Sequence, residues 1–123
     1  MILVDTSVWV DHLRSANTML NALLEGGEVI AHPFVISELA LGNLRRRDEL
    51  LQALQRLPQA ISASHAEVLQ LIDREALFGR RIGYVDAHLL AAARLTVGSS
   101  LWTHDRRLHA VAAQLGVAAA LSH

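Results

Sequence analysis

The sequence contains no lysine and no cysteine, and these two absences exclude several kinds of chemistry. Without cysteine the chain cannot form disulfides, thiolate zinc sites, iron–sulfur clusters or a thiol nucleophile. Without lysine it has no side chain for the phosphates of a P-loop and no amine for Schiff-base chemistry. The eleven basic residues other than histidine are therefore all arginine.

An excess of positive charge and long apolar runs are also missing. The formal net charge is -1, which by itself argues against a nucleic-acid partner. No segment approaches the roughly 18 apolar residues of a membrane span. The N-terminal apolar run has no basic region before it and stops at Asp5, so we expect no signal peptide and no membrane contact, and we expect a cytoplasmic protein.

Short apolar runs alternate with helical patterns along the chain, and no linker or repeat interrupts them. Strands are predicted at residues 2–4, 28–31, 60–61, 100–103 and 117–120. Helices are predicted at residues 6–14, 17–25, 33–44, 48–57, 65–78, 84–97 and 105–115, and the segment 84–97 is apolar nearly all round. This alternation indicates one α/β domain over residues 1–123, layered around a parallel sheet.

Two aspartates follow predicted strands, where ligands collect in open parallel sheets. Asp5 comes directly after the first strand, and Thr103 and Asp105 follow the strand that contains Trp102. An aspartate before a helix can equally serve as a helix cap, so this alternative stays open for both residues.

Two further acids share apolar stripes of predicted helices. The stripe of Glu38 contains Phe34, Val35, Leu41 and Gly42, and the stripe of Asp86 contains Leu89, Leu90, Ala93 and Val97. An acid on such a stripe is costly to bury unless a cation, hydrogen bonds or water compensates its charge. A water-exposed helix end is the alternative for each acid alone, whereas four such acids together predict a shared cation.

Two other aspartates are set apart from these four. Asp11 precedes Arg14 by three residues and is expected on a solvated helix face. Asp73 has Leu69 and Leu77 one turn to either side, so its geometry resembles that of the four acids and its role stays open.

Four carboxylates without cysteine favour Mg²⁺ or Mn²⁺ over zinc or copper. His88 lies about 160° around its predicted helix from Asp86, so the two are not expected to share a ligand cluster. A carboxylate site without a nucleotide-binding loop suits phosphodiester hydrolysis. A haloacid-dehalogenase-type phosphatase would need an Asp-x-Asp motif that starts at Asp5, but this chain has Ser7 in place of the second aspartate. Both that phosphatase and a receiver domain would also need a lysine, which the chain lacks.

Four short motifs surround these acids. They are MILVDTSVW at residues 1–9, SEL at residues 37–39 followed by Gly42, GYVDAHLLA at residues 83–91 and THDRRL at residues 103–108. In this order and spacing, over essentially the whole chain, they resemble the PIN domain, and more narrowly the VapC toxins of bacterial toxin–antitoxin pairs.

The resemblance implies a three-layer α/β/α sandwich with a parallel central sheet and an endoribonuclease that depends on Mg²⁺ or Mn²⁺. It also implies a tRNA or ribosomal RNA substrate, a homodimer and a cognate VapB-type antitoxin that blocks the site. Apolar helix faces near residues 9–24 and 35–44 are candidate contacts for either partner, although core packing also explains such stripes.

The family's catalytic acids carry over to Asp5, Glu38, Asp86 and Asp105, of which Asp5, Asp86 and Asp105 would bind metal. Thr6, Ser7 and Thr103 match positions whose hydroxyl groups support the metal or its carboxylates. We expect Glu38 to orient the attacking water and the products to carry 5′-phosphate and 3′-hydroxyl ends.

Contacts with RNA have to come from arginine, whose planar fork suits phosphate oxygens. The candidates are Arg106 and Arg107 beside the site, and Arg80 and Arg81. The triple at residues 45–47 precedes two acids and fits an ordinary solvated surface better. Without the four site acids, eleven arginines face eight acids, so the net charge of -1 no longer argues against RNA.

Two other functions stay open at this point. The chain could be a PIN nuclease with a DNA substrate or a role in RNA processing. It could also be a PIN-like module that only binds a partner, although such a module has no chemical reason to keep four acids together.

Overall fold

The computed structural model describes residues 1–121. The strands are β1 (Ile2–Val4), β2 (Val29–Ile30) and β3 (Ser100–Trp102). The helices are α1 (Thr6–Arg14), α2 (Thr18–Glu25), α3 (Pro33–Ala40), α4 (Arg47–Arg56), α5 (His65–Arg74), α6 (Tyr84–Leu95) and α7 (Arg106–Gln114). None of the helices in this part of the chain has the length and apolar character that a membrane span requires.

The sheet has the order β2-β1-β3, and both pairs of neighbouring strands are parallel. The predicted α/β class with a parallel sheet is therefore confirmed. The strands predicted at residues 60–61 and 117–120 appear only as single parallel bridges, at Gln59 beside β2 and at Ala118 beside β3. They extend no further because β2 gives way to α3 at Pro33 and β3 ends at Trp102.

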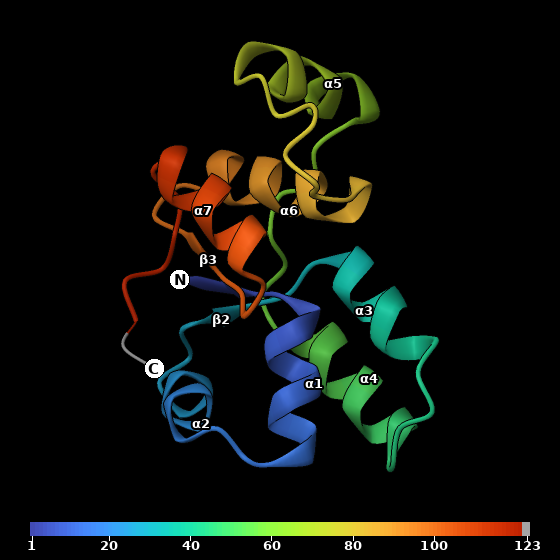
Figure 1. Cartoon of the computed structure of the whole chain (residues 1–123). Helices are drawn as coiled ribbons and strands as arrows, with labels where there is room; N and C mark the ends of the chain where they lie inside the picture. Colours follow the sequence, from blue (N-terminus) through green and yellow to red (C-terminus); the bar gives the residue numbers. More distant parts are fainter. Residues whose placement is uncertain (122–123) are drawn as a thin grey trace.

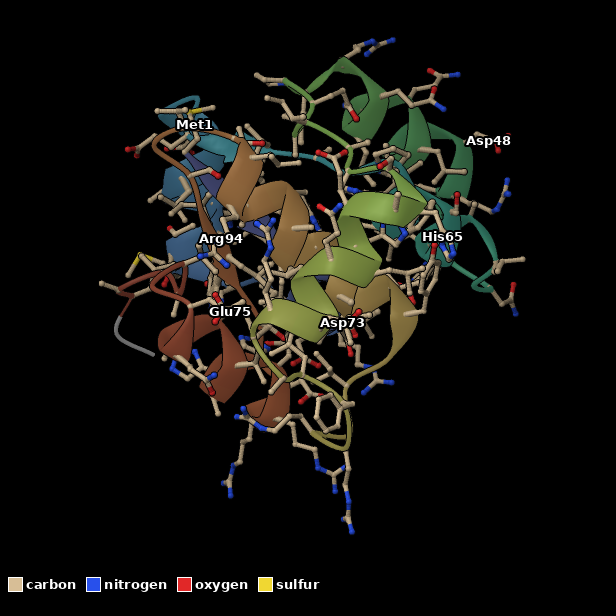
Figure 2. The ribbon with its side chains drawn as sticks, turned by 90° about the horizontal axis from the view of Figure 1, so that it is seen from above. Met1, Asp48, His65, Asp73, Glu75 and Arg94 are labelled. Carbon is tan, nitrogen blue, oxygen red and sulfur yellow. The ribbon has the colours of Figure 1, made fainter. Side chains whose placement is uncertain are left out.

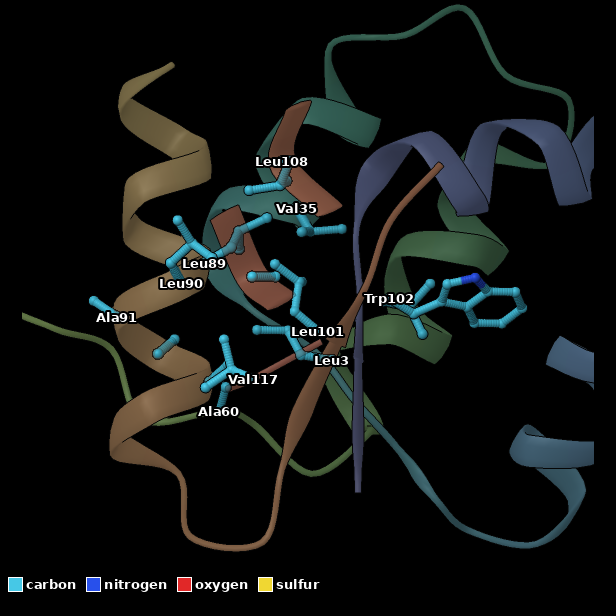
Figure 3. Packing of buried hydrophobic residues seen from close by; sticks show 14 of the residues in the cluster. Leu3, Val35, Ala60, Leu89, Leu90, Ala91, Leu101, Trp102, Leu108 and Val117 are labelled. Carbon is cyan, nitrogen blue, oxygen red and sulfur yellow. The ribbon is translucent and has the colours of Figure 1, made fainter. Parts of the chain in front are cut away.

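Helices cover both faces of this sheet. Figure 1 shows α6 and α7 on one side of the strands and α1, α2 and α4 on the other. Figure 3 shows Leu89 and Leu90 of α6 directed toward Leu3 and Leu101 of the central strands. Seven consecutive residues of α6, at positions 87–93, are buried, which confirms the prediction for the middle of this helix. The prediction is wrong at the C-terminal end, because the helix ends at Leu95 and Val97 beyond it is 96% exposed.

The helix α5 ends four residues before its predicted end at residue 78. Ala76 adopts a left-handed backbone with φ of 50°. Its N–H donates to the carbonyl of Asp73 at 3.3 Å, and the N–H of Leu77 donates to the carbonyl of Ile72 at 2.9 Å. This is a Schellman cap, in which the residue after the left-handed one commonly packs inward. The helix ends early because Leu77 turns away to become buried in the core.

The helix α3 ends at Ala40 rather than at the predicted residue 44. The Nε of Arg47 donates to the Ala40 carbonyl at 2.9 Å, so a side chain from the start of α4 satisfies the end of α3. Leu41 consequently lies outside the helix and is 89% exposed. The apolar stripe predicted around Glu38 is therefore wrong beyond residue 40, because the helix does not continue.

Candidate functional site

Asp5 lies where β1 ends, next to the end of β3. Its backbone N–H donates to the carbonyl of Trp102 at 2.9 Å, and the residue is only 6% exposed. It occupies the position before α1, but its side chain accepts no backbone N–H of that helix as a cap would. Helix capping therefore does not explain Asp5, and its buried carboxylate requires other partners.

Two hydroxyl groups hold the Asp5 carboxylate. Ser7 Oγ donates to Oδ2 at 2.7 Å, and Thr103 Oγ1 donates to the same oxygen at 2.8 Å. Ser7 Oγ also accepts the N–H of His104 at 3.0 Å, and Thr103 Oγ1 accepts the N–H of Asp105 at 3.0 Å. Because each hydroxyl has a single hydrogen, both are committed to Asp5. The network fixes Asp5 and joins the start of α1 to the segment after β3.

Glu38 reaches this region from α3. Thr6 Oγ1 donates to its Oε1 at 2.7 Å. Since Thr6 directly follows Asp5 in the chain, this bond holds the α3 carboxylate beside the end of β1. Glu38 is exposed, so its carboxylate is accessible to water.

Asp86 is the third residue of α6 and is partly buried. Its Oδ2 accepts the N–H of Gly83 at 3.0 Å. Burial raises the pKa of Asp86 above its ordinary value, and the Gly83 N–H opposes that rise. The negative charges of Asp5, Asp105 and Glu38 raise the pKa further. The carboxylates of Asp5, Asp105 and Glu38 therefore lie near enough to Asp86 to act on its charge.

Asp105 caps α7, as the alternative interpretation predicts. Its Oδ1 accepts the N–H groups of Arg107 and Leu108 at 2.9 and 3.0 Å. Asp105 is nevertheless exposed, and its Oδ2 receives no hydrogen bond from the described residues. Capping thus uses only one of its two oxygens.

All four acids share this arrangement of one held and one open carboxylate oxygen. Each has one oxygen held by a donor of the protein and one that receives no hydrogen bond within residues 1–121. The held oxygens are Oδ2 of Asp5, Oε1 of Glu38, Oδ2 of Asp86 and Oδ1 of Asp105. Fixed carboxylates with a second oxygen open are suited to bind a ligand without losing their own support.

These oxygens form a donor set that fits a hard divalent cation. Burial is the main cause of the raised pKa of Asp86, and the negative charges of the other three acids add to it. In the described part of the chain, no three acidic or histidine side chains are already arranged as a metal site. The chemistry of the donors thus fits a cation, although the four carboxylates are not already arranged around one.

Asp73, the acid whose role the sequence left open, does not join this group. It is exposed on α5 (Figure 2), and its charge is not among those that raise the pKa of Asp86. Its neighbour Leu69 is 47% exposed, and Leu77 lies beyond the end of the helix. The apolar flank that made Asp73 resemble the four acids is therefore not formed.

One pair near the site was missed by the sequence interpretation. His104 Nδ1 lies 2.6 Å from Asp11 Oδ2. Asp11 is exposed as predicted, but its contact is with His104 rather than with Arg14. The pair strengthens the attachment of the segment after β3 to α1. No local pattern could reveal it, because 93 positions separate the two residues.

Two histidines are buried in the core between α3 and α6. The ring of His88 packs edge to face against Phe34 and Tyr84, with centroids 4.6 and 4.5 Å apart. Burial lowers the pKa of His88, and the charge of His65 lowers it further. Burial and then His88 lower the pKa of His32 to about 4. His88 thus contacts rings, as expected for a residue that shares no ligand cluster with Asp86.

The arginines predicted to contact RNA lie in two places. Arg106 and Arg107 begin α7 and are exposed. A hollow of about 330 Å³ beside the site is lined by Thr103, His104, Asp105, Arg106 and His109. Arg80 and Arg81 lie between α5 and α6, where Arg80 donates to Gln114 Oε1 at 2.6 Å. Arg81 is exposed and makes no hydrogen bond or ion pair within the described residues.

Comparison with known proteins identifies the family of this chain. A family model described as "PIN domain" matches residues 2–114. The chain belongs to the PIN-domain family. This PIN domain is also 51% identical over 120 residues to the protein named "Ribonuclease VapC32" from Mycobacterium tuberculosis strains CDC 1551 / Oshkosh and ATCC 25618 / H37Rv. The match covers 98% of this chain and 97% of that protein.

The comparison confirms the resemblance inferred from the four motifs. Identity at this level over nearly the full length groups this PIN domain with the VapC ribonucleases. All four acids and the hydroxyl residues that support them lie within the matched residues 2–114. The parallel sheet with helices on both faces agrees with a PIN-like α/β sandwich.

Proposed function

We propose that this protein is a metal-dependent endoribonuclease and the toxin of a VapBC toxin–antitoxin system, formed by a single domain over residues 1–123. The observation that carries the proposal is the set of four carboxylates, each with one oxygen fixed by the protein and one open. The 51% identity to a ribonuclease VapC supports the substrate class and the toxin role.

Asp5, Asp86 and Asp105 would hold one or two Mg²⁺ or Mn²⁺ ions through their open oxygens. When bound, the cation supplies Lewis-acid stabilisation of the charge that develops on the scissile phosphate. Ser7 and Thr103 keep Asp5 in place through its other oxygen, and the N–H of Gly83 does the same for Asp86.

Glu38 orients the attacking water in this proposal. Thr6 fixes Oε1 at 2.7 Å, so Oε2 is left to accept a hydrogen bond from water. The water oxygen forms a bond to phosphorus, in line with the P–O3′ bond, which breaks. The attacking water releases a proton to solvent, and the leaving 3′ oxygen takes up a proton from solvent. The products therefore carry a 5′-phosphate and a 3′-hydroxyl.

The RNA is a tRNA or a ribosomal RNA in this proposal. Arg106 and Arg107 contact its phosphates on one side of the four acids, and Arg80 and Arg81 do so on another. Exposed arginine beside the acids offsets the repulsion that a polyanion would otherwise meet there.

A cognate VapB-type antitoxin inhibits the enzyme, which is a homodimer in this proposal. Leu13 and Leu41 lie within the two apolar segments predicted for such contacts. They are 41% and 89% exposed, so both segments offer apolar surface to a partner.

Growth of a bacterial host during controlled expression tests the toxin role. Wild-type protein is expected to arrest growth, and Asp5→Asn is expected to remove this effect at equal expression. Asp73→Asn is the matched control, because it removes a carboxylate that lies outside the site, and it should stay toxic. Folded, RNA-cleaving wild-type protein without any effect on growth would favour a role in RNA processing instead.

A further inference from the structure

Two exposed aromatic residues lie at one pocket of the molecule. The chain has only two phenylalanines, two tryptophans and one tyrosine. Phe78 and Tyr84 are 71% and 49% exposed. Both line a pocket of about 240 Å³ between the end of α5 and the start of α6. Exposing aromatic rings to water is unfavourable, so the presence of two exposed rings at one pocket points to a ligand.

The Tyr84 ring is held in a fixed orientation. Its hydroxyl lies 2.9 Å from Nδ1 of His65, and its ring packs edge to face on buried His88. A ring fixed in this way loses little freedom when it binds a partner. Phe78 follows directly after Leu77, whose burial ends α5 and leaves the next side chain in solvent.

The pocket adjoins Asp86, one of the four acids, through Gly83. Gly83 lines the pocket, and its N–H donates to Oδ2 of Asp86 at 3.0 Å. A ligand in the pocket would therefore lie beside the carboxylate centre.

The charge at the pocket favours an anion. Arg81 lines it, and no acid does so among the described residues. Arg81 has a left-handed backbone with φ of 63°, which is unusual for a residue other than glycine. A second hollow, of about 280 Å³, lies between α5 and α6 and is lined by charges of both signs. They include the ion pair of Glu75 and Arg94 at 3.1 Å (Figure 2), so this hollow does not favour an anionic ligand.

We propose that the pocket of Phe78, Tyr84 and Arg81 binds an unpaired base of the RNA next to the cleaved phosphate. The base stacks on the aromatic rings, which suits any flat base, and Arg81 contacts an adjoining phosphate. The volume is below the roughly 300 Å³ of pockets for drug-sized ligands and suits one base. This inference rests on the proposed ribonuclease function.

The test measures binding of a short single-stranded RNA that carries 2-aminopurine, in EDTA so that cleavage is prevented. Wild-type protein should change the fluorescence of the base analogue at one position of the RNA. Phe78→Ala should remove that change and weaken binding about tenfold, the effect of losing one base–aromatic stack. Phe78→Tyr keeps a ring and should bind within about twofold of wild type. Val97→Ala, at a residue that is 96% exposed elsewhere, is the matched control.

A second variant tests the arginine without disturbing the backbone. Arg81→Gly keeps the left-handed conformation and removes the guanidinium. It should lower the slope of log affinity against log salt by about one. An unchanged slope would overturn the phosphate contact.

The outcomes separate this inference from the proposed function. If Phe78→Ala binds and cleaves RNA like wild type while Asp86→Asn is inactive, the pocket is not a base site but the ribonuclease proposal stands. If Phe78→Ala loses only inhibition by the antitoxin, the pocket binds protein and the inference is overturned. If wild-type protein neither binds nor cleaves RNA, both proposals fail.

Discussion

Replacing Thr103 by valine probes the support of the Asp5 carboxylate. Valine has nearly the shape of threonine but no hydroxyl group. Thr103 is buried, and its hydroxyl donates to Asp5 Oδ2 at 2.8 Å and accepts the N–H of Asp105 at 3.0 Å. The substitution therefore removes two hydrogen bonds without opening a cavity.

The expected loss follows from these two bonds. A hydrogen bond to a charged group contributes about 1.5–3 kcal/mol, and a buried partner left unsatisfied adds to the cost. Ser7 still donates to Asp5, and exposed Asp105 lies near water. We therefore expect the free energy of unfolding to fall by about 2–4 kcal/mol, a large part of the usual ~5–15 kcal/mol.

Urea denaturation followed by tryptophan fluorescence measures this loss. Trp9 and Trp102 are both buried, and Trp102 directly precedes the substituted residue. Thr103→Ser keeps the hydroxyl, loses only a methyl group and should cost about 1 kcal/mol. A Thr103→Val protein as stable as Thr103→Ser would refute the role assigned to the hydroxyl.

Three further outcomes are expected. The pKa of His32 is about 4 in the folded protein against an ordinary 6.5. Between these two pH values the unfolded chain binds more protons than the folded protein does, so the free energy of unfolding falls by about 2 kcal/mol between neutral pH and pH 5. His32→Asn keeps an acceptor for the helix cap and should make the free energy of unfolding depend less on pH in urea titrations at several pH values. An unchanged dependence on pH would contradict the lowered pKa of buried His32. Ala76→Gly should stabilise the protein by about 1 kcal/mol, because Ala76 has a φ of 50°, whereas exposed Ala66→Gly within α5 should destabilise it by a similar amount in the same assay. Mg²⁺ at a hundred times its dissociation constant should stabilise wild type by about 2.7 kcal/mol in thermal unfolding, and an equal gain in Asp5→Asn would exclude Asp5 as a ligand.

Much of the fold was predictable because local patterns determine it. The apolar runs predict the three strands, and the enclosed helix α6 follows from a sequence that is apolar nearly all round. Asp5 and Asp105 could be selected because each closely follows a strand, and the structure places both at that edge of the sheet. Their catalytic roles stay predictions.

Glu38 was selected for a reason that is only partly correct. Its expected apolar stripe stops when α3 ends, since Arg47 satisfies the Ala40 carbonyl and Leu41 is exposed. What brings Glu38 to the other acids is the hydrogen bond from Thr6, 32 positions away. Such a contact depends on how α1 and α3 pack and has no local signal.

The end of α5 shows why the pocket was missed. The helix predicted at residues 65–78 would end at Gly79, because glycine favours the left-handed conformation. Ala76 adopts this conformation first, since Leu77 is drawn into the core. This shift takes Phe78 out of the helix and exposes it, and only the tertiary packing of Leu77 determines that outcome.

The ends of the RNA fragments test the central proposal most directly. Purified wild-type protein in Mg²⁺ is expected to yield fragments with 5′-phosphate and 3′-hydroxyl ends, with no cleavage in excess EDTA and none by Asp86→Asn. Fragments that end in a 2′,3′-cyclic phosphate, or full cleavage in excess EDTA, would contradict hydrolysis by a metal-dependent carboxylate site.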